Sequence, residues 1–300
     1  MPVITKDKGI IYEFSRKNHP IISIPSRSTI TIEAYDCFKN QIDSPKTVVS
    51  DIDWKQINPA TGPIFVEGAS PGDILKVKIE KIDLSTQGVM VVGPNLGVMG
   101  HRITEMEAKI IPIVDGKAKF NDLNIPLNPM VGVIGVAPAG ESVNCGTPGS
   151  HGGNMDNKMV AEGATLYFPV FTEGALFALG DCHAAMGDGE ISVSGIEIPA
   201  NVTVTLEVIK GASLQHPMLE NDEVFTQIVS APTLDAACKE ATEFMADLLV
   251  AKTGLTLSEV TMLLSAAGQV EVCQMVDPLM TARFSVPKYL LDQLNIKQLF

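Results

Sequence analysis

The chain has 300 residues, of which 45% are hydrophobic and 19% charged, and its mean hydropathy is +0.20. This composition excludes wholesale disorder and predicts one large fold or two closely packed subdomains. The 35 acidic residues outnumber the 22 Lys and Arg and give a formal net charge of −13. Such an acidic surface repels phosphate groups, so we expect neither nucleic acid nor an anionic membrane as a partner.

The N-terminal residues, the longest uncharged stretch and the cysteines indicate the cellular location of the protein. Residues 1–14 mix charges into the apolar positions and lack the hydrophobic region of a signal peptide. The longest uncharged stretch, residues 123–140, is interrupted by three prolines, which a membrane-spanning helix would not tolerate. The five cysteines are widely spaced and form no C-x-x-C pair, which argues against a disulfide framework and against a thiolate zinc site. We therefore expect a soluble protein of the reducing cytoplasm.

The first 230 residues show the alternation of polar and apolar side chains that is typical of β-strands, separated by turn residues. Residues 29–35 alternate polar and apolar side chains as a half-buried strand does, and residues 74–82 continue this pattern over a longer run. Residues 201–209 form a third run, which is rich in β-branched side chains. Residues 1–230 therefore predict an antiparallel β domain of the sandwich or barrel type. Turns are predicted where Gly, Pro, Asn and Asp cluster, at residues 58–63, 70–73 and 115–117.

The C-terminal part of the chain changes to helical periodicity. Residues 233–252 place apolar side chains on one helical face, and residues 256–267 follow with the spacing of a capping box. A strand over residues 269–276 and a short helix over residues 287–294 complete the prediction. The fold class is therefore α+β, predominantly antiparallel β, with a smaller α/β portion over residues 231–300 packed on the first domain.

The most unusual segment, residues 180–190, reads Gly-Asp-Cys-His-Ala-Ala-Met-Gly-Asp-Gly-Glu and follows an apolar run. A strand that leads into a glycine-rich loop commonly presents polar groups at the rim of a β scaffold. Asp181 and His183 are two residues apart, so their side chains fall on one face of an extended backbone, and Asp188 and Glu190 repeat this spacing. These groups suit a zinc-type divalent ion, with a free carboxylate as the base for a bound water. The alternative interpretation is a solvated acidic loop.

Two other segments offer polar groups of the same kind. Residues 147–156 contain a Gly–Gly pair, which permits backbone conformations closed to other residues, together with His151, Asn154 and Asp156. Asp36 directly follows the first predicted strand. Both segments can also be interpreted as ordinary turns.

Cys182 lies between the acidic and imidazole groups of the unusual segment. A thiol nucleophile needs surroundings that lower its pKa, whereas neighbouring carboxylates favour the neutral thiol. We therefore do not expect Cys182 to act as a nucleophile. The sequence also lacks the G-x-x-x-x-G-K-[ST] pattern of an ATP-binding loop.

These segments resemble the acetamidase/formamidase family. Their order and spacing match the family over about residues 1–210, and the fourth segment is long enough to be specific. The matching segments are residues 33–42, 58–73, 151–156, 163–190 and 195–197.

The resemblance implies hydrolysis of short aliphatic amides, of the acetamide or formamide type, to a carboxylate and ammonia. It also implies a divalent metal, with zinc the first choice, and a homo-oligomer of two or more subunits. Whether a second ion such as calcium binds at an acidic turn stays open. The implied metal ligands are Asp36, Asp181 and His183, and the implied catalytic residues are Glu190 and His183. The implied substrate-binding or structural residues are His151, Asn154, Asp156 and Asp188. The sequence leaves open which carboxylates are ligands and which one is the base.

One residue departs from the family pattern. Formamidase-like members have Gln at the position of Met186, and the loss of this amide would alter formamide specificity. This departure keeps a non-catalytic interpretation open, and a thiol mechanism is a separate, third hypothesis. The chain could be a non-catalytic small-molecule or metal-binding protein on the same scaffold, or a thiol amidase that uses Cys182 or Cys145.

Overall fold

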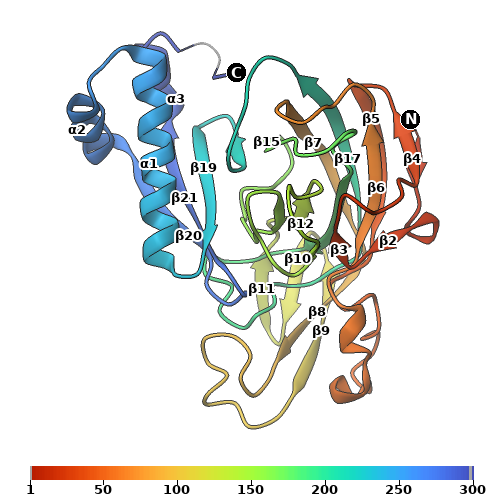
Figure 1. Ribbon diagram of the computed structural model, residues 1–300. Helices are drawn as coiled ribbons and strands as arrows, with labels where there is room; N and C mark the ends of the chain where they lie inside the picture. Colours follow the sequence, from red (N-terminus) through yellow and green to blue (C-terminus); the bar gives the residue numbers. More distant parts are fainter. Residues whose placement is uncertain (1, 297–298) are drawn as a thin grey trace.

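The computed structural model describes residues 2–296 and 299–300 (Figure 1). Its largest sheet has nine strands, and neighbouring strands pair in antiparallel fashion except β1 and β5. In spatial order these strands are β1 (Val3–Ile4), β5 (Ser28–Ala34), β17 (Ala200–Ile209), β7 (Ile74–Leu84), β15 (Thr165–Pro169), β18 (Met218–Glu220), β19 (Val224–Ala231), β21 (Met280–Pro287) and β20 (Gln269–Gln274).

A second sheet of six strands carries the unusual segment at the end of one strand. Its order is β14 (Gly152–Asn154), β12 (Met130–Gly135), β16 (Phe177–His183), β6 (Ala60–Val66) and β2 (Ile10–Ile11), with β4 (Ile22–Ile24) also paired to β6. The smaller sheets consist of β11 (Leu123–Pro126), β10 (Lys117–Phe120), β9 (Glu107–Val114) and β8 (Gln87–Val92), and of β13 (Val143–Asn144) with β3 (Glu13–Phe14). The short 3₁₀ helices are η1 (Lys6–Lys8), η2 (Val49–Asp51) and η3 (Trp54–Gln56).

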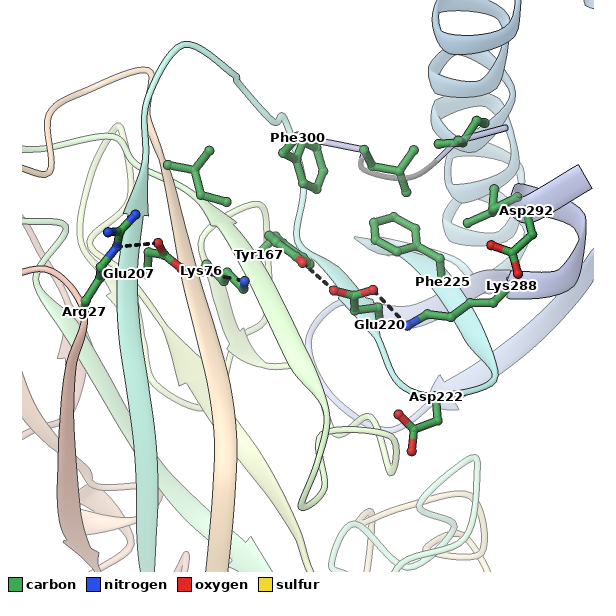
Figure 2. A pocket seen from close by; sticks show the side chains of 14 residues that line it. Arg27, Lys76, Tyr167, Glu207, Glu220, Asp222, Phe225, Lys288, Asp292 and Phe300 are labelled. Atoms are coloured by element: carbon green, nitrogen blue, oxygen red, sulfur yellow. Dashed lines mark hydrogen bonds and ion pairs between the residues drawn. The ribbon is translucent and has the colours of Figure 1, made fainter. Parts of the chain in front are cut away.

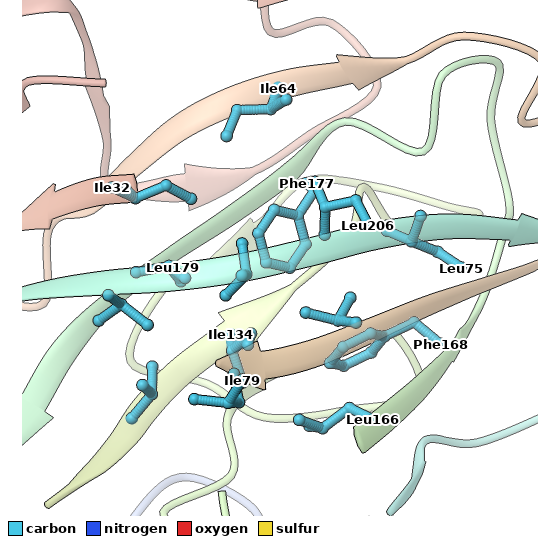
Figure 3. Close-up of a cluster of buried hydrophobic side chains, with 14 of the residues drawn as sticks. Ile32, Ile64, Leu75, Ile79, Ile134, Leu166, Phe168, Phe177, Leu179 and Leu206 are labelled. Carbon is cyan, nitrogen blue, oxygen red and sulfur yellow. The ribbon is translucent and has the colours of Figure 1, made fainter. Parts of the chain in front are cut away.

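The main core lies between the two large sheets (Figure 3). Ile79 and Phe168 come from the nine-stranded sheet, and Ile134 and Phe177 come from the six-stranded sheet. All four side chains are fully buried, and each contributes about 1.5–3 kcal/mol by leaving water. At the end of β16, Cys182 belongs to this core, and the polar side chains of Asp181 and His183 are also buried.

The C-terminal residues add helices to one end of the nine-stranded sheet. Helix α1 (Leu234–Thr253) packs on β19 and β21, α2 (Leu257–Ala267) follows it, and α3 (Lys288–Gln293) comes directly after β21 (Figure 1). The Thr256 hydroxyl accepts a hydrogen bond from the backbone N–H of Glu259, whose carboxylate accepts one from Thr256 in return. The predicted capping box is therefore confirmed. No helix among the described residues is long and apolar enough to cross a membrane.

The structure confirms the predicted α+β fold with predominantly antiparallel sheets. The nine-stranded sheet runs through the predicted boundary at residue 230, because β19 pairs with β18 on one side and with β21 on the other. The C-terminal portion therefore extends the sheet of the first portion, and the division into two domains stays a prediction.

The predicted turn over residues 58–63 is wrong, because β6 begins at Ala60. Gly62 and Pro63 fit within a strand here because the register of β6 against β16 shifts between Phe177 and Leu179. This irregularity accommodates a proline, which cannot donate to the ladder. The predicted turn at Asp115–Gly116 is confirmed by the hairpin of β9 and β10, and both residues have positive φ.

Candidate functional site

Strand pairing brings three distant segments together at the end of β16. Val131 and Val133 of β12 pair with Cys182 and Gly180 of β16, and on its other edge Val133 pairs with Asn154 of β14. Gly132 lies between the two valines and has no side chain. The space beside Gly132 is therefore open to side chains from the ends of β14 and β16. The loops after these two strands therefore meet beside β12.

Four buried side chains converge around one imidazole. Nε2 of His183 lies 3.3 Å from Oδ1 of Asp181, 3.2 Å from Oε2 of Glu197 and 3.8 Å from Oδ1 of Asp156. Glu190 joins the same group, since its carboxylate lies within 4.8 Å of ligand atoms on Asp156 and His183. All five residues are at most 6% exposed. We call these five residues the acidic cluster.

Two glycines make room for the acidic cluster. A Cβ at Gly132 would lie 2.3 Å from Oδ1 of Asp156 and 2.6 Å from Oδ2 of Asp181. A Cβ at Gly195 would lie 2.5 Å from Nδ1 of His183. Real Cβ atoms do not approach this closely, so both positions require glycine as long as the cluster keeps its geometry.

Three of the acidic residues have a backbone conformation that is rare outside glycine. The φ angle is +41° at Asp156, +53° at Asp181 and +46° at Glu190. Such conformations cost about 1–3 kcal/mol each and concentrate at functional sites. The chain therefore holds these carboxylates in place at the expense of local strain.

The pKa values in the cluster are strongly shifted. Burial raises the pKa of Glu190 well above its usual range, and the nearby Asp156 carboxylate raises it further. Burial likewise raises the pKa of Asp156, with Asp181 as the next contribution. Burial alone would lower the pKa of His183, but the charges of Glu197 and Asp181 outweigh it and raise this pKa well above its usual value. The cluster therefore attracts positive charge.

The cluster fits a divalent cation. Both carboxylate oxygens of Asp156 and Nδ1 of His183 are buried and have no hydrogen-bond partner among residues 2–296 and 299–300. Two groups of three residues place ligand atoms within 4.8 Å of one another: Asp156 with His183 and Glu190, and Cys37 with Asp181 and Glu197. Carboxylate and imidazole donors without a bonding partner are the usual protein ligands of zinc.

A cavity of about 290 Å³ borders the cluster. Its walls are largely apolar, and Phe38 and Trp54 contribute an edge-to-face aromatic pair with ring centroids 6.3 Å apart. Asp181, Glu190 and Glu197 line its polar side. Neither Lys nor Arg lines it in the part of the chain that the structure describes. The arrangement presents acidic groups to a small, mainly apolar chamber.

The structure gathers some of the predicted site residues and places others elsewhere. Asp156, Asp181, His183 and Glu190 belong to the cluster. Asn154 lines the cavity, and its Nδ2 donates a hydrogen bond of 2.9 Å to Oδ2 of Asp277.

Asp36 is buried at the end of β5 and forms part of a turn. Its Oδ1 accepts a hydrogen bond of 2.6 Å from the backbone N–H of Asn40, and its own N–H donates to the Asn40 side chain. Burial raises the pKa of Asp36 to about 6. Asp36 belongs to neither of the two groups that could hold a metal among the described residues.

His151 and Asp188 also lie outside the cluster. His151 is 2% exposed and packs edge-on against Phe14, and burial lowers its pKa to about 4. Asp188 forms ion pairs with Arg283 at 2.9 Å and with Lys158 at 2.7 Å.

Sequence reasoning missed three residues of the site. Glu197 lies in a segment of the family resemblance, but only its isolated bridges to Val89 and His183 bring it to the cluster. Cys37 lines the cavity. Its only signal in the sequence was its position directly after Asp36. Asp277 lies on a turn after β20, nearly a hundred residues from Asp181, and had no signal at all.

The two cysteines of the thiol hypothesis are unsuited to nucleophilic attack. Cys182 is fully buried in the main core, and Cys145 is fully buried beside Phe14 and Ala60. Burial raises the pKa of both thiols. A thiolate nucleophile requires the opposite shift.

A larger cavity of about 780 Å³ lies away from the cluster, between the nine-stranded sheet and the last residues of the chain (Figure 2). Its lining contains the ion pairs Arg27–Glu207 and Lys288–Glu220. The Tyr167 hydroxyl also donates to Glu220. These five polar groups are paired with one another.

The chain is similar to proteins of known structure over nearly its whole length. The chain is similar to a recombinant predicted acetamidase/formamidase from Thermoanaerobacter tengcongensis, with 49% identity, a TM-score of 0.97 and coverage of 99% of this chain and 98% of that chain. It is also similar to an acetamidase from Bacillus halodurans, with 44% identity, a TM-score of 0.95 and coverage of 97% and 99%.

Similarity to curated relatives is lower. An acetamidase from Mycolicibacterium smegmatis is 28% identical, and the match covers 64% of this chain and 65% of that protein, so the chain spans less than two thirds of this relative. The model of the acetamidase/formamidase family matches residues 14–145 and 139–293. The chain therefore belongs to the acetamidase/formamidase family.

Proposed function

We propose that this protein hydrolyses short aliphatic amides to a carboxylate and ammonia at the acidic cluster. The observation that carries this proposal is the convergence of four buried carboxylates on His183 beside a chamber of about 290 Å³. The names of the similar proteins, acetamidase and acetamidase/formamidase, support the same chemistry.

Hydrolysis of an amide needs a polarised carbonyl, an activated water and a proton for the departing nitrogen. Glu190 suits the proton transfers, because burial raises its pKa and so makes its carboxylate a stronger base for a proton from water. Its place on the wall of the cavity puts its carboxylate within reach of a bound amide. We therefore assign Glu190 as the general base and acid.

The remaining cluster residues are suited to hold a divalent cation, and we propose zinc. We retain Asp181 and His183 as ligands and add Asp156, whose two oxygens have no hydrogen-bond partner in the described part of the chain. When bound, such an ion supplies Lewis-acid polarisation of the carbonyl and a water of lowered pKa. Asp36 is assigned instead to the turn that it forms with Asn40, and a calcium site stays a prediction.

The cavity favours a small acyl group. Its apolar wall, with Phe38 and Trp54, accommodates a short aliphatic chain, whereas its small volume excludes long ones. Asn154 donates from Nδ2 to Asp277, whereas its buried Oδ1 has no hydrogen-bond partner among the described residues and can accept from the N–H of an amide substrate. Met186 lines a neighbouring apolar cavity of about 570 Å³ and not the chamber beside the cluster. The exchange of Gln for Met therefore removes no direct contact in this chamber.

We also propose a homo-oligomer and a cytoplasmic location, on the grounds already given from the sequence. Size-exclusion chromatography with light scattering tests the first, and fractionation of cells tests the second.

The direct test is ammonia release from a panel of primary amides, from formamide to long-chain amides. The metal-loaded protein should turn over the short amides, lose activity on chelation and regain it with zinc. Binding of these amides without release of ammonia would instead support the non-catalytic alternative. Full activity after chelation would refute the metal requirement but not the amidase activity.

A further inference from the structure

We propose that Arg283 is a positioning residue that fixes Asp156 and Glu190 relative to each other. The proposal rests on the function proposed above, because it concerns the two acidic loops of that site. Arg283 lies in β21, in the C-terminal portion of the chain, and is fully buried. The sequence shows no pattern that connects it with the acidic residues.

The Arg283 guanidinium joins the two loops. Nη1 donates to Oδ1 of Asn157 at 3.1 Å and to Oδ1 of Asp188 at 3.0 Å, and Nη2 donates to Oδ2 of Asp188 at 2.9 Å. Asn157 directly follows Asp156, and Asp188 lies two residues before Glu190. One rigid group therefore contacts the chain next to both carboxylates.

The guanidinium is itself held in one orientation. Glu271 of the neighbouring strand β20 accepts two further bonds from Arg283, each of 3.2 Å. Glu271 is fixed in turn by the Ser285 hydroxyl, which donates to it at 2.7 Å. Because Glu271 and Arg283 are paired in register, both belong to the regular sheet. The loops are therefore anchored to the nine-stranded sheet.

A second contact from the same strands supports this anchoring. The backbone N–H of Gly189 donates to the carbonyl of Cys273 at 2.8 Å, so the residue between Asp188 and Glu190 is also tied to β20. Asp156 and Glu190 both have positive φ and would relax to other conformations without restraint. A buried ion pair is a weak source of stability, which favours a role of Arg283 in geometry.

The test compares Arg283→Lys and Asp188→Asn with the control Lys158→Met. Lysine keeps the charge but cannot form the planar fork to Asp188. The Asp188 side chain is 29% exposed, so Asp188→Asn should fold even if Arg283→Lys does not. We expect kcat to fall about 10- to 100-fold in both variants, with KM changed less than about threefold. Lys158→Met removes only the half-exposed ion pair to Asp188 and should leave kcat within about twofold.

Two further readouts separate positioning from plain destabilisation. If Arg283 and Asp188 act as a unit, the double variant should lose no more activity than the worse single variant. Zinc affinity, measured by titration of the apo protein, should weaken about 10- to 100-fold in Asp188→Asn. A lowered melting temperature with unchanged kcat and zinc affinity would overturn the proposal. If the wild type releases no ammonia, the proposed amidase function is wrong, and the zinc titration alone then tests the positioning role of Arg283. A wild type that neither hydrolyses amides nor binds zinc would overturn the proposed function and the positioning role together.

Discussion

Replacement of Gly132 by alanine tests the geometry of the acidic cluster with one methyl group. Gly132 lies in β12, and its φ is outside the left-handed region, so alanine fits the backbone. The new Cβ would meet Oδ1 of Asp156 at 2.3 Å and Oδ2 of Asp181 at 2.6 Å, whereas ordinary contact begins at 3.4 Å. The two carboxylates must therefore move by about 1 Å.

A displacement of about 1 Å at a reacting group costs about 10²-fold in rate. We therefore expect Gly132→Ala to lower kcat for a short primary amide about 100-fold and to weaken metal binding, while the circular dichroism spectrum is retained. Gly140→Ala is the matched control, because a Cβ there has no neighbour within 4 Å. A folded Gly132→Ala protein with kcat within about threefold of the wild type would refute the reasoning.

Three further predictions follow from the site and its surroundings. Glu190→Gln should keep the fold and the metal while kcat falls about 10²–10⁴-fold, as expected for loss of a general base. His183→Ala should lose both the bound metal and the activity, so metal analysis beside kcat distinguishes the two variants. A Glu190→Gln protein that purifies without metal would reverse the assignment of ligand and base. Cys182→Ser and Cys145→Ser should retain kcat per folded molecule, because both thiols are buried in apolar clusters; loss of kcat with an intact fold would favour a thiol mechanism. The pKa of His151 is lowered to about 4 in the folded protein, so the unfolded chain binds more protons between pH 6.5 and 4. The free energy of unfolding should therefore decrease by up to about 3 kcal/mol as the pH is lowered through this window. Urea unfolding of His151→Gln should show a smaller decrease, and an equal decrease would contradict the role of His151.

The regular elements could be predicted because their signals are local. Alternation places the strands β5, β7 and β17 within about two residues of their observed bounds, and caps place α1 and α2. The turn prediction at residues 58–63 failed because pairing with β16 outweighed the local preference of Gly62 and Pro63. A strand irregularity of this kind depends on a partner more than a hundred residues away.

The candidate site could be predicted only in part, for the same reason. The side chains of Asp181 and His183 do lie together as their i, i+2 spacing predicts, at 3.3 Å, although Asp181 has a φ of +53° and is not extended. The same spacing misled for Asp188 and Glu190, because Gly189 and Glu190 have φ values of +99° and +46° and are not extended. Glu197 reaches the cluster through contacts between strands that no local pattern records.

The central claim is that amides are hydrolysed at the acidic cluster. Ammonia and carboxylate released from acetamide, measured side by side for metal-loaded wild type and Glu190→Gln, test it most directly. We expect equimolar ammonia and acetate from the wild type and a rate lower by about 10²–10⁴-fold from the folded, metal-loaded variant. Equal rates from the two proteins, or no ammonia from the wild type with any short amide, would contradict the claim.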